Sequence, residues 1–233
     1  MKTLPVIAFL IAVVIAAFVW LRPDSDHPSA PGIQDLPKGL PWQIEILANG
    51  NSRVFGLELA HSTLDDARGR FGDGMKIGIV AAQGEAGALE AYYDTVTAGV
   101  FLGRMILVAA LDPETLAQLR ERSIRRSYMN DTTYRYDLDP EDLSVALRTP
   151  IAAMTFIPAA NLDAETVLKR FGPPQERLRT GDQLEHFLYP DKGLDVIVDD
   201  QGKDVLQYVV PREFARLREP LGQGGMRVPS GGR

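Results

Sequence analysis

The stretch DAETVLKRFGPP, residues 163–174, contains the pattern that decides the predicted fold. Asp163 is a typical helix N-cap, because its carboxylate can accept hydrogen bonds from the free amide groups of the first turn. Gly172 and the two prolines after it end the helix. Between these signals, apolar residues recur at the spacing of one helix face: Ala164, Val167, Leu168 and Phe171. The sequence therefore predicts a short amphipathic helix over Asp163–Phe171.

Three runs of strand-forming residues follow this helix, at Leu184–Tyr189, Gly193–Val198 and Lys203–Val210. Turn-forming residues separate these runs. Short connections of this kind join antiparallel neighbours, and a helix with one apolar face packs on the sheet that they form. Residues 149–219 are therefore predicted to form one α+β unit, with a closing helix over Pro211–Arg218.

The same order of elements occurs earlier in the chain. A capping-box spacing at Ser62–Asp65 starts a helix that ends in Arg70-Phe71-Gly72, and Arg170-Phe171-Gly172 repeats those three residues 100 positions later. Leu89–Tyr92 then parallels Leu184–Phe187 at an offset of 95. We interpret the match as a tandem duplication, with chance or a shared fold constraint as the alternatives.

The predicted fold class is α+β, with an N-terminal transmembrane helix followed by two tandem units, each a helix packed on an antiparallel sheet. The first unit covers residues 42–148 and includes a helical insertion. Residues 23–41 are rich in proline and form a spacer. Residues 220–233 are rich in glycine and are predicted to be a disordered tail. Two such sheets side by side could form a concave surface.

The second unit resembles a known family. Over Ala164–Val210, a capped helix ending in Phe-Gly-Pro-Pro precedes a strand ending in Tyr-Pro, then Gly-Leu-x-Val-x-Val and a Gly-Lys turn. This order is similar to the SmpA/OmlA (BamE-like) outer-membrane assembly domain, and its tandem use is similar to the architecture of the β-lactamase inhibitor protein. The resemblance implies a protein–protein interaction module of the cell envelope, and it does not identify the partner.

Leu4–Leu21 is a run of 18 residues without charge. A helix of that length nearly spans the hydrocarbon core of a bilayer, which is about 30 Å thick. Lys2 before the run and the acidic residues after it favour a cytoplasmic N-terminus. The run is therefore predicted to be a signal anchor over residues 1–22, which places the chain in the inner membrane with its body in the periplasm. A cleaved secretory peptide is the alternative.

Composition excludes several classes of function. Lys and Arg total 25 against 31 Asp and Glu, so the net charge is −6 and nucleic acid is not an expected partner. The sequence has no Cys, which rules out thiolate nucleophiles, disulfides and a lipoprotein anchor. The three His show no metal-ligand spacing. We expect no metal and no cofactor.

Candidate contact residues come from the two repeats. Tyr93 and Leu188 are predicted to point to the sheet face opposite the helices, and Tyr189 lies beside them, so these three are interface candidates if that face is open. A helix rich in arginine provides a second candidate surface. Arg122, Arg125 and Arg126 on that helix could contact an anionic surface, with an ordinary solvated helix face as the alternative.

Catalytic signals are weak. Glu90 and Glu185 occupy equivalent strand positions in the predicted repeat, and a close pair of carboxylates could perform acid–base chemistry. Outward-facing charge on an antiparallel sheet is the favoured explanation of both residues. The predicted function is therefore a membrane-anchored, non-catalytic interaction or assembly module whose partner is another envelope protein. A carboxylate-dependent hydrolase of an envelope polymer and a lipid-binding envelope protein are the alternatives.

Overall fold

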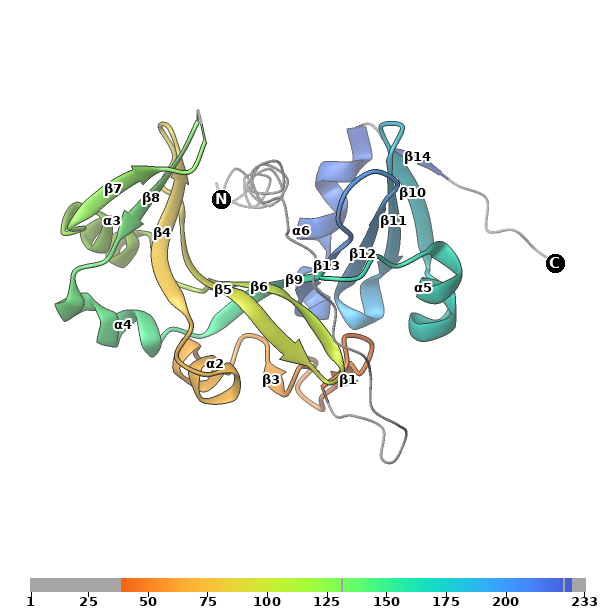
Figure 1. The fold of residues 1–233 in the computed structure, drawn as a ribbon, viewed down its shortest axis with the longest axis horizontal. Helices are drawn as coiled ribbons and strands as arrows, with labels where there is room; N and C mark the ends of the chain where they lie inside the picture. Colours follow the sequence, from red (N-terminus) through yellow and green to blue (C-terminus); the bar gives the residue numbers. More distant parts are fainter. Residues whose placement is uncertain (1–38, 131, 224, 228–233) are drawn as a thin grey trace.

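The computed structural model of the chain describes residues 39–130, 132–223 and 225–227. Its centre is one antiparallel sheet of eleven strands, in the order β14-β10-β11-β12-β13-β9-β6-β5-β4-β8-β7. The sheet is bent into a U, with β5, β6, β9 and β13 across the bottom and the other strands rising in two arms (Figure 1).

The sheet has two similar halves that meet in the middle. The first half contains β4 (Lys76–Ala82), β5 (Ala88–Ala98), β6 (Phe101–Ala109) and β9 (Ile151–Pro158). The second half contains β10 (Glu176–Thr180), β11 (Leu184–Tyr189), β12 (Leu194–Asp199) and β13 (Val205–Val209). The halves join where β9 pairs with β13, with Thr155 opposite Gln207. Each half follows the order helix, then four neighbouring strands, whereas the sequence analysis predicts only three strands after the second helix and misses β10.

Matching hydrogen bonds support this equivalence. The phenol of Tyr93 donates to the Gly72 carbonyl at 3.2 Å, and the phenol of Tyr189 donates to the Gly172 carbonyl at 2.9 Å. Burial raises the pKa of each phenol to about 12. Both tyrosines therefore tie the second strand of their half to the glycine that ends the preceding helix.

The predicted fold class needs correction in its arrangement. The chain is largely β, and the two units do not form separate sheets, because β9 and β13 merge them into one. The predicted offset of 95 is also wrong by one residue, because the tyrosine pair sets it at 96. Glu90 therefore corresponds to His186 and Tyr92 to Leu188. A shift of one residue moves a strand's side chains to the opposite face, so Tyr93 and Leu188, which are predicted to share a face, point to opposite faces.

The main hydrophobic core lies on the convex face of the sheet, beneath α2 (Leu64–Phe71) and α5 (Ala164–Phe171) (Figure 1). Both predicted helices are confirmed. Thr63 is the N-cap of α2 and exchanges hydrogen bonds with Asp66, one residue later than the predicted box. Asp163 is the N-cap of α5, as predicted.

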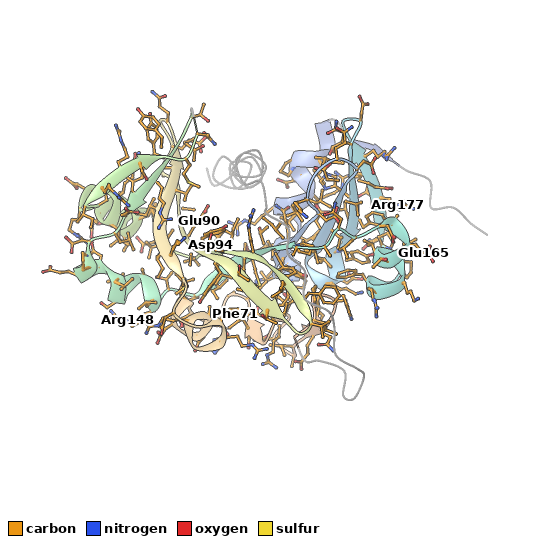
Figure 2. The ribbon with its side chains drawn as sticks, in the orientation of Figure 1. Phe71, Glu90, Asp94, Arg148, Glu165 and Arg177 are labelled. Atoms are coloured by element: carbon orange, nitrogen blue, oxygen red, sulfur yellow. The ribbon has the colours of Figure 1, made fainter. Side chains whose placement is uncertain are left out.

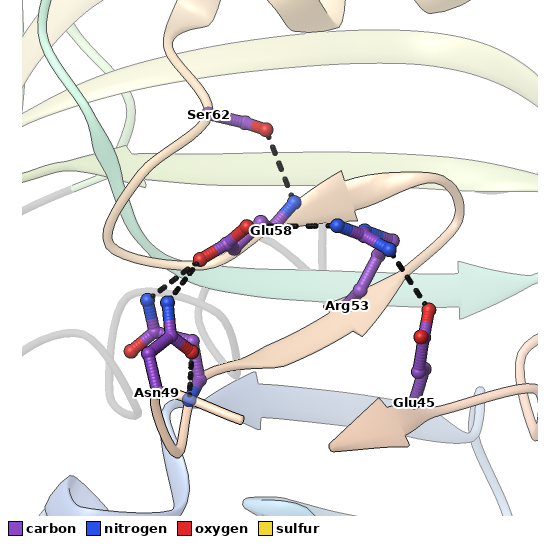
Figure 3. A network of polar contacts seen from close by, with 6 residues as sticks. Glu45, Asn49, Arg53, Glu58 and Ser62 are labelled. Atoms are coloured by element: carbon purple, nitrogen blue, oxygen red, sulfur yellow. Dashed lines mark hydrogen bonds and ion pairs between the residues drawn. The ribbon is translucent and has the colours of Figure 1, made fainter. Parts of the chain in front are cut away.

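A small separate sheet of three strands packs on the same core. It consists of β1 (Glu45–Ile46), β2 (Ser52–Val54) and β3 (Leu57–Glu58), with a turn at Asn49-Gly50. The Glu58 carboxylate accepts hydrogen bonds from the side-chain amides of Asn49 and Asn51, at 2.8 and 2.9 Å (Figure 3). This network holds the turn against β3.

The insertion of the first half follows β6. It contains α3 (Pro113–Glu121), β7 (Arg125–Tyr128), β8 (Thr133–Asp137), η1 (Pro140–Asp142) and α4 (Leu143–Leu147). β8 pairs with β4, so β7 and β8 extend the sheet beyond the repeated part. The insertion is therefore partly a β-ribbon, whereas the sequence analysis predicts helices alone.

The end of the chain turns back over the concave face. The short helices η3 (Pro211–Glu213), α6 (Ala215–Arg218) and η4 (Glu219–Gln223) lie inside the second arm (Figure 1). After these helices, β14 (Gly225–Arg227) pairs with β10. A further short helix, η2 (Pro190–Lys192), joins β11 to β12. The predicted disordered tail is therefore wrong for residues 220–223 and 225–227, which have regular structure.

The membrane prediction also requires correction. Among the helices in the described part of the chain, none combines the length and the apolar character needed to cross a bilayer. This finding contradicts the transmembrane helix in the predicted fold class and the single-pass location in the inner membrane. Leu4–Leu21, on which the signal anchor was predicted, and most of the spacer lie outside the described residues.

Candidate functional site: a groove on the concave face

The concave face contains a groove of about 590 Å³ where the two halves of the sheet meet. Its floor comes from β6, β9 and β13, with Val108, Ala153 and Val209 side by side in register. Leu217 of α6 belongs to one wall, and the turn into α3 at Asp112-Pro113 belongs to the other. The groove therefore spans both halves and is lined largely by apolar side chains.

Continuous apolar runs in the central strands create this floor. Side chains alternate between the two faces of a strand, so one buried face needs an apolar residue at every second position. On β6, Met105 and Leu107 enter the convex core, while Ile106 and Val108, which alternate with them, face the groove. A strand that is apolar on both faces is expected where both faces are covered. On this sheet, the concave side of the first half carries no described helix.

Glu90 is the unusual group beside the groove. It lies on β5 directly opposite Val108, and Ala88 on the same face is part of the groove lining. Its side chain points toward the inside of the U (Figure 2). Glu90 is 9% exposed, and its carboxyl makes no hydrogen bond or ion pair with another described residue. Burial raises the pKa of Glu90 to about 8, and the positive charge of Arg135 opposes that rise only in part.

Arg135 lies on the same sheet face as Glu90, over the space left by the missing side chain of Gly78. Gly78 lies opposite Glu90 on β4, and a Cβ atom there would come within 3.1 Å of Arg135 Nε. Arg135 instead directs its Nε to Asp137 at 3.2 Å. The guanidinium is therefore occupied by an aspartate and does not pair with Glu90.

The equivalent place in the second half holds His186, whose two ring nitrogens both have partners, whereas Asp195 Oδ1 beside it is buried without a hydrogen-bond partner. His186 Nδ1 lies 2.8 Å from Asp195 Oδ2, and His186 Nε2 lies 2.9 Å from Thr180 Oγ1. The pKa of Asp195 is raised by burial, although His186 opposes the rise. Hydroxyl, imidazole and carboxylate stand in the order of a catalytic triad. However, the side chains of His186 and Asp195 are only 3% and 2% exposed, which favours a structural role.

The predicted interface residues are buried. Tyr93 is 1% exposed, Leu188 0% and Tyr189 4%. Both tyrosines face the convex core, so the predicted orientation of Tyr93 is wrong. Leu188 does face the concave side, but it packs against Phe214 and Leu217 at the C-terminal helices. None of these three side chains is available to a partner in this structure.

The prediction that Arg122, Arg125 and Arg126 lie on one helix is also wrong. α3 ends at Glu121, and Arg125 and Arg126 lie on β7 instead. Arg122 forms an ion pair with Asp142 at 2.7 Å, and Arg125 forms one with Asp137 at 2.6 Å. Arg126 stacks over the Tyr134 ring at 4.7 Å. The structure separates the three arginines, and contact with an anionic surface stays a prediction.

The carboxylate pair of the hydrolase alternative does not assemble. Glu185 receives the Arg177 guanidinium at 2.6 Å, and its β11 position alternates with that of His186. Glu185 and Glu90 therefore lie on opposite faces and in different halves of the sheet (compare Arg177 and Glu90 in Figure 2). In the part of the chain that the structure describes, no three His, Asp or Glu side chains gather as metal ligands.

The sequence analysis missed the groove residues. Val209 belongs to the predicted strand Lys203–Val210, but the face that it shares with Val108 and Ala153 carries no predicted role. The available signal was the loss of alternation in RMILVAA and IAAMTFI, where both faces are apolar. Such runs predict that both faces of a strand are buried, whereas the main hydrophobic core of this fold covers only the convex face.

No protein-family model matches the chain, and no curated protein and no solved structure matches it. The resemblance to the SmpA/OmlA (BamE-like) domain therefore stays a prediction. The function must be inferred from the groove itself.

Proposed function

We propose that the chain is a non-catalytic protein-binding module that holds an apolar segment of a partner in the concave groove. The observation that supports this proposal most directly is the groove's apolar floor, formed jointly by β6, β9 and β13. The floor side chains are only partly open, with Val108 9% and Val209 3% exposed, and a partner that covers the apolar surface that remains exposed gains free energy. The burial of His186 and Asp195 supports a role without catalysis. A place in the cell envelope rests on the resemblance alone.

The shape of the groove favours a segment of a protein chain, rather than a flat protein surface, as the binding partner. Its volume of about 590 Å³ lies within the range of about 300–1,000 Å³ typical of ligand sites. Residues of α6 and of the turn into α3 line the groove beside the floor strands β6, β9 and β13, so an extended or helical segment can enter where a flat surface cannot. Apolar segments bound in grooves of this kind use a few anchoring side chains.

The proposal is tested by selecting peptides from a random displayed library on the immobilised full-length chain. We expect enriched sequences with several apolar positions. Ala153→Arg, which places a charge in the middle of the floor, should abolish the enrichment. Ala153→Leu, which fills the floor without charge, should weaken it. Ala48→Arg is the matched control, because Ala48 is exposed and outside the groove lining, and it should leave the selection unchanged.

Three outcomes would overturn the proposal. The first is the absence of any enriched peptide. The second is enrichment that survives both substitutions of Ala153, with the variants shown to be folded by circular dichroism. The third comes from a photoreactive phenylalanine analogue placed at Val108. A crosslink from that position to the chain's own Leu4–Leu21, or to lipid, would assign the groove to another occupant.

A further inference from the structure

We propose that the segment bound in the groove carries a basic side chain, Lys or Arg, that pairs with the Glu90 carboxylate. This inference rests on the proposed function and specifies the chemistry of the partner. It identifies Glu90 as a specificity-determining residue at the edge of an otherwise apolar site.

The first argument is the position of Glu90. Directly opposite residues on antiparallel strands have Cβ atoms about 4.5–5.5 Å apart, and Glu90 is opposite the groove residue Val108. A buried polar group without a partner costs about 1–3 kcal/mol, and a charged group costs more. Glu90 is 9% exposed and has no hydrogen-bond partner among the described residues, so a ligand that completes its hydrogen bonds offsets part of the cost of its burial.

The second argument is the charge around Glu90. The basic groups on the same face are engaged elsewhere: Lys76 with Asp94 across the β4–β5 pair, and Arg135 with Asp137. Arg104 on β6 lies near Asp94 and lowers its pKa. On the far wall, Glu213 pairs with Arg216. Asp112 at the near wall caps α3 and adds a negative charge. The described surroundings therefore leave an acidic excess beside the groove, which is complementary to a cation.

The comparison between the two halves gives the third argument. At the position equivalent to Glu90, His186 is completed by Thr180 and Asp195 and covered by the cluster that includes Leu217. The first half has the ionisable group and the apolar neighbours but neither the polar partners nor the helix. A partner segment with apolar side chains and one basic group supplies both of these missing elements.

The chemistry can be tested directly with three ligands that share an eight-carbon chain: n-octylammonium, octan-1-ol and octanoate. Their dissociation constants are measured on the full-length chain by NMR titration at pH 8.5. We expect octylammonium to bind at least about tenfold more tightly than octanol, and octanoate to bind most weakly. Glu90→Gln should bring octylammonium and octanol within about twofold of each other while leaving octanol binding unchanged.

The pH dependence provides a second measurement on the same ligands. Binding of the ammonium group requires ionised Glu90, so its affinity should rise about tenfold per pH unit between pH 6 and 7.5 and level off above about pH 8. Octanol binding should not follow this profile. The pKa values of Asp94 and Asp112 are lowered by hydrogen bonds from Lys76 and Thr115, so these two carboxylates should be ionised throughout this range.

The outcomes separate the two proposals. If octylammonium and octanol bind equally well, or if Glu90→Gln does not change their ratio, the basic partner is refuted while the apolar groove remains. If none of the three ligands binds, the groove itself is refuted. Peptide selection gives the same separation. Enriched peptides should contain Lys or Arg on the wild-type chain and lose that preference on Glu90→Gln, and apolar peptides without a basic residue would overturn this inference alone.

Discussion

Replacement of Glu90 by Gln should stabilise the protein, and the gain should depend on pH. In the folded chain the carboxyl keeps its proton up to a pKa of about 8, whereas in the unfolded chain it releases the proton near 4.5. Between these values unfolding releases one proton, so a rise in pH favours the unfolded state. Gln has nearly the same shape and no proton to release.

The magnitude follows from the two pKa values. Each pH unit between them is equivalent to about 1.4 kcal/mol. At pH 7 the interval above 4.5 is 2.5 units, so Glu90→Gln should raise the free energy of unfolding by about 3 kcal/mol. Below pH 4.5 the carboxyl is protonated in both states and the difference should vanish. Above pH 8 it should reach a plateau of about 5 kcal/mol.

Urea unfolding followed by far-ultraviolet circular dichroism measures this difference at pH 4, 5, 6, 7 and 8. The exposed Glu114 supplies a control, because Glu114→Gln should change stability by no more than about 0.5 kcal/mol at any of these values. A gap between wild type and Glu90→Gln that stays constant from pH 4 to 8 would refute the reasoning. A lower stability of the variant at pH 8 would refute it more strongly.

Two further predictions concern the packing of the repeats. Leu188→Ala should reduce the free energy of unfolding by about 2–5 kcal/mol, because Leu188 is fully buried against the C-terminal helices. Leu168→Ala, at a site 38% exposed, should reduce it by about 1 kcal/mol or less. Equal losses of stability in thermal unfolding would contradict this packing. Tyr93→Phe and Tyr189→Phe should each cost about 1 kcal/mol, because each removes one hydrogen bond to the glycine carbonyl after a helix. Urea midpoints would show the two losses to be similar, and a large difference would argue against the equivalence of the halves.

The sequence predicted the local elements well because their signals are local. Asp163 and Gly172 bound one helix by capping chemistry that acts within a single turn. The strands Leu184–Tyr189 and Leu194–Asp199 are marked by β-branched and aromatic residues, and both are present with nearly the predicted bounds. The prediction for the arginine-rich stretch was wrong because no local signal in the sequence shows that the helix stops at Glu121.

The candidate site was out of reach because it depends on register and on contacts distant in the sequence. An offset of 95 in place of 96 paired Glu90 with Glu185 and placed Tyr93 on the wrong face. The decisive information was the tyrosine hydrogen bond to a glycine about 20 residues earlier, which no periodicity reveals. The pairing of β9 with β13, which forms the floor of the groove, joins residues about 50 positions apart.

The difference between the two halves explains why the groove exists. Both halves carry an ionisable group on the concave face, at Glu90 and His186, and both bring apolar neighbours to it. In the second half the chain continues through α6, whose cluster with Leu188 covers the face, and Asp195 completes the imidazole. In the first half the chain instead leaves β9, the counterpart of β13, for α5 on the convex face, so that the described chain places no helix over Val108 and no partner at Glu90. Only one copy of the duplicated fold covers its concave face. In the other copy, the apolar groove and the Glu90 carboxyl carry a cost in free energy that a partner's apolar and basic side chains can offset.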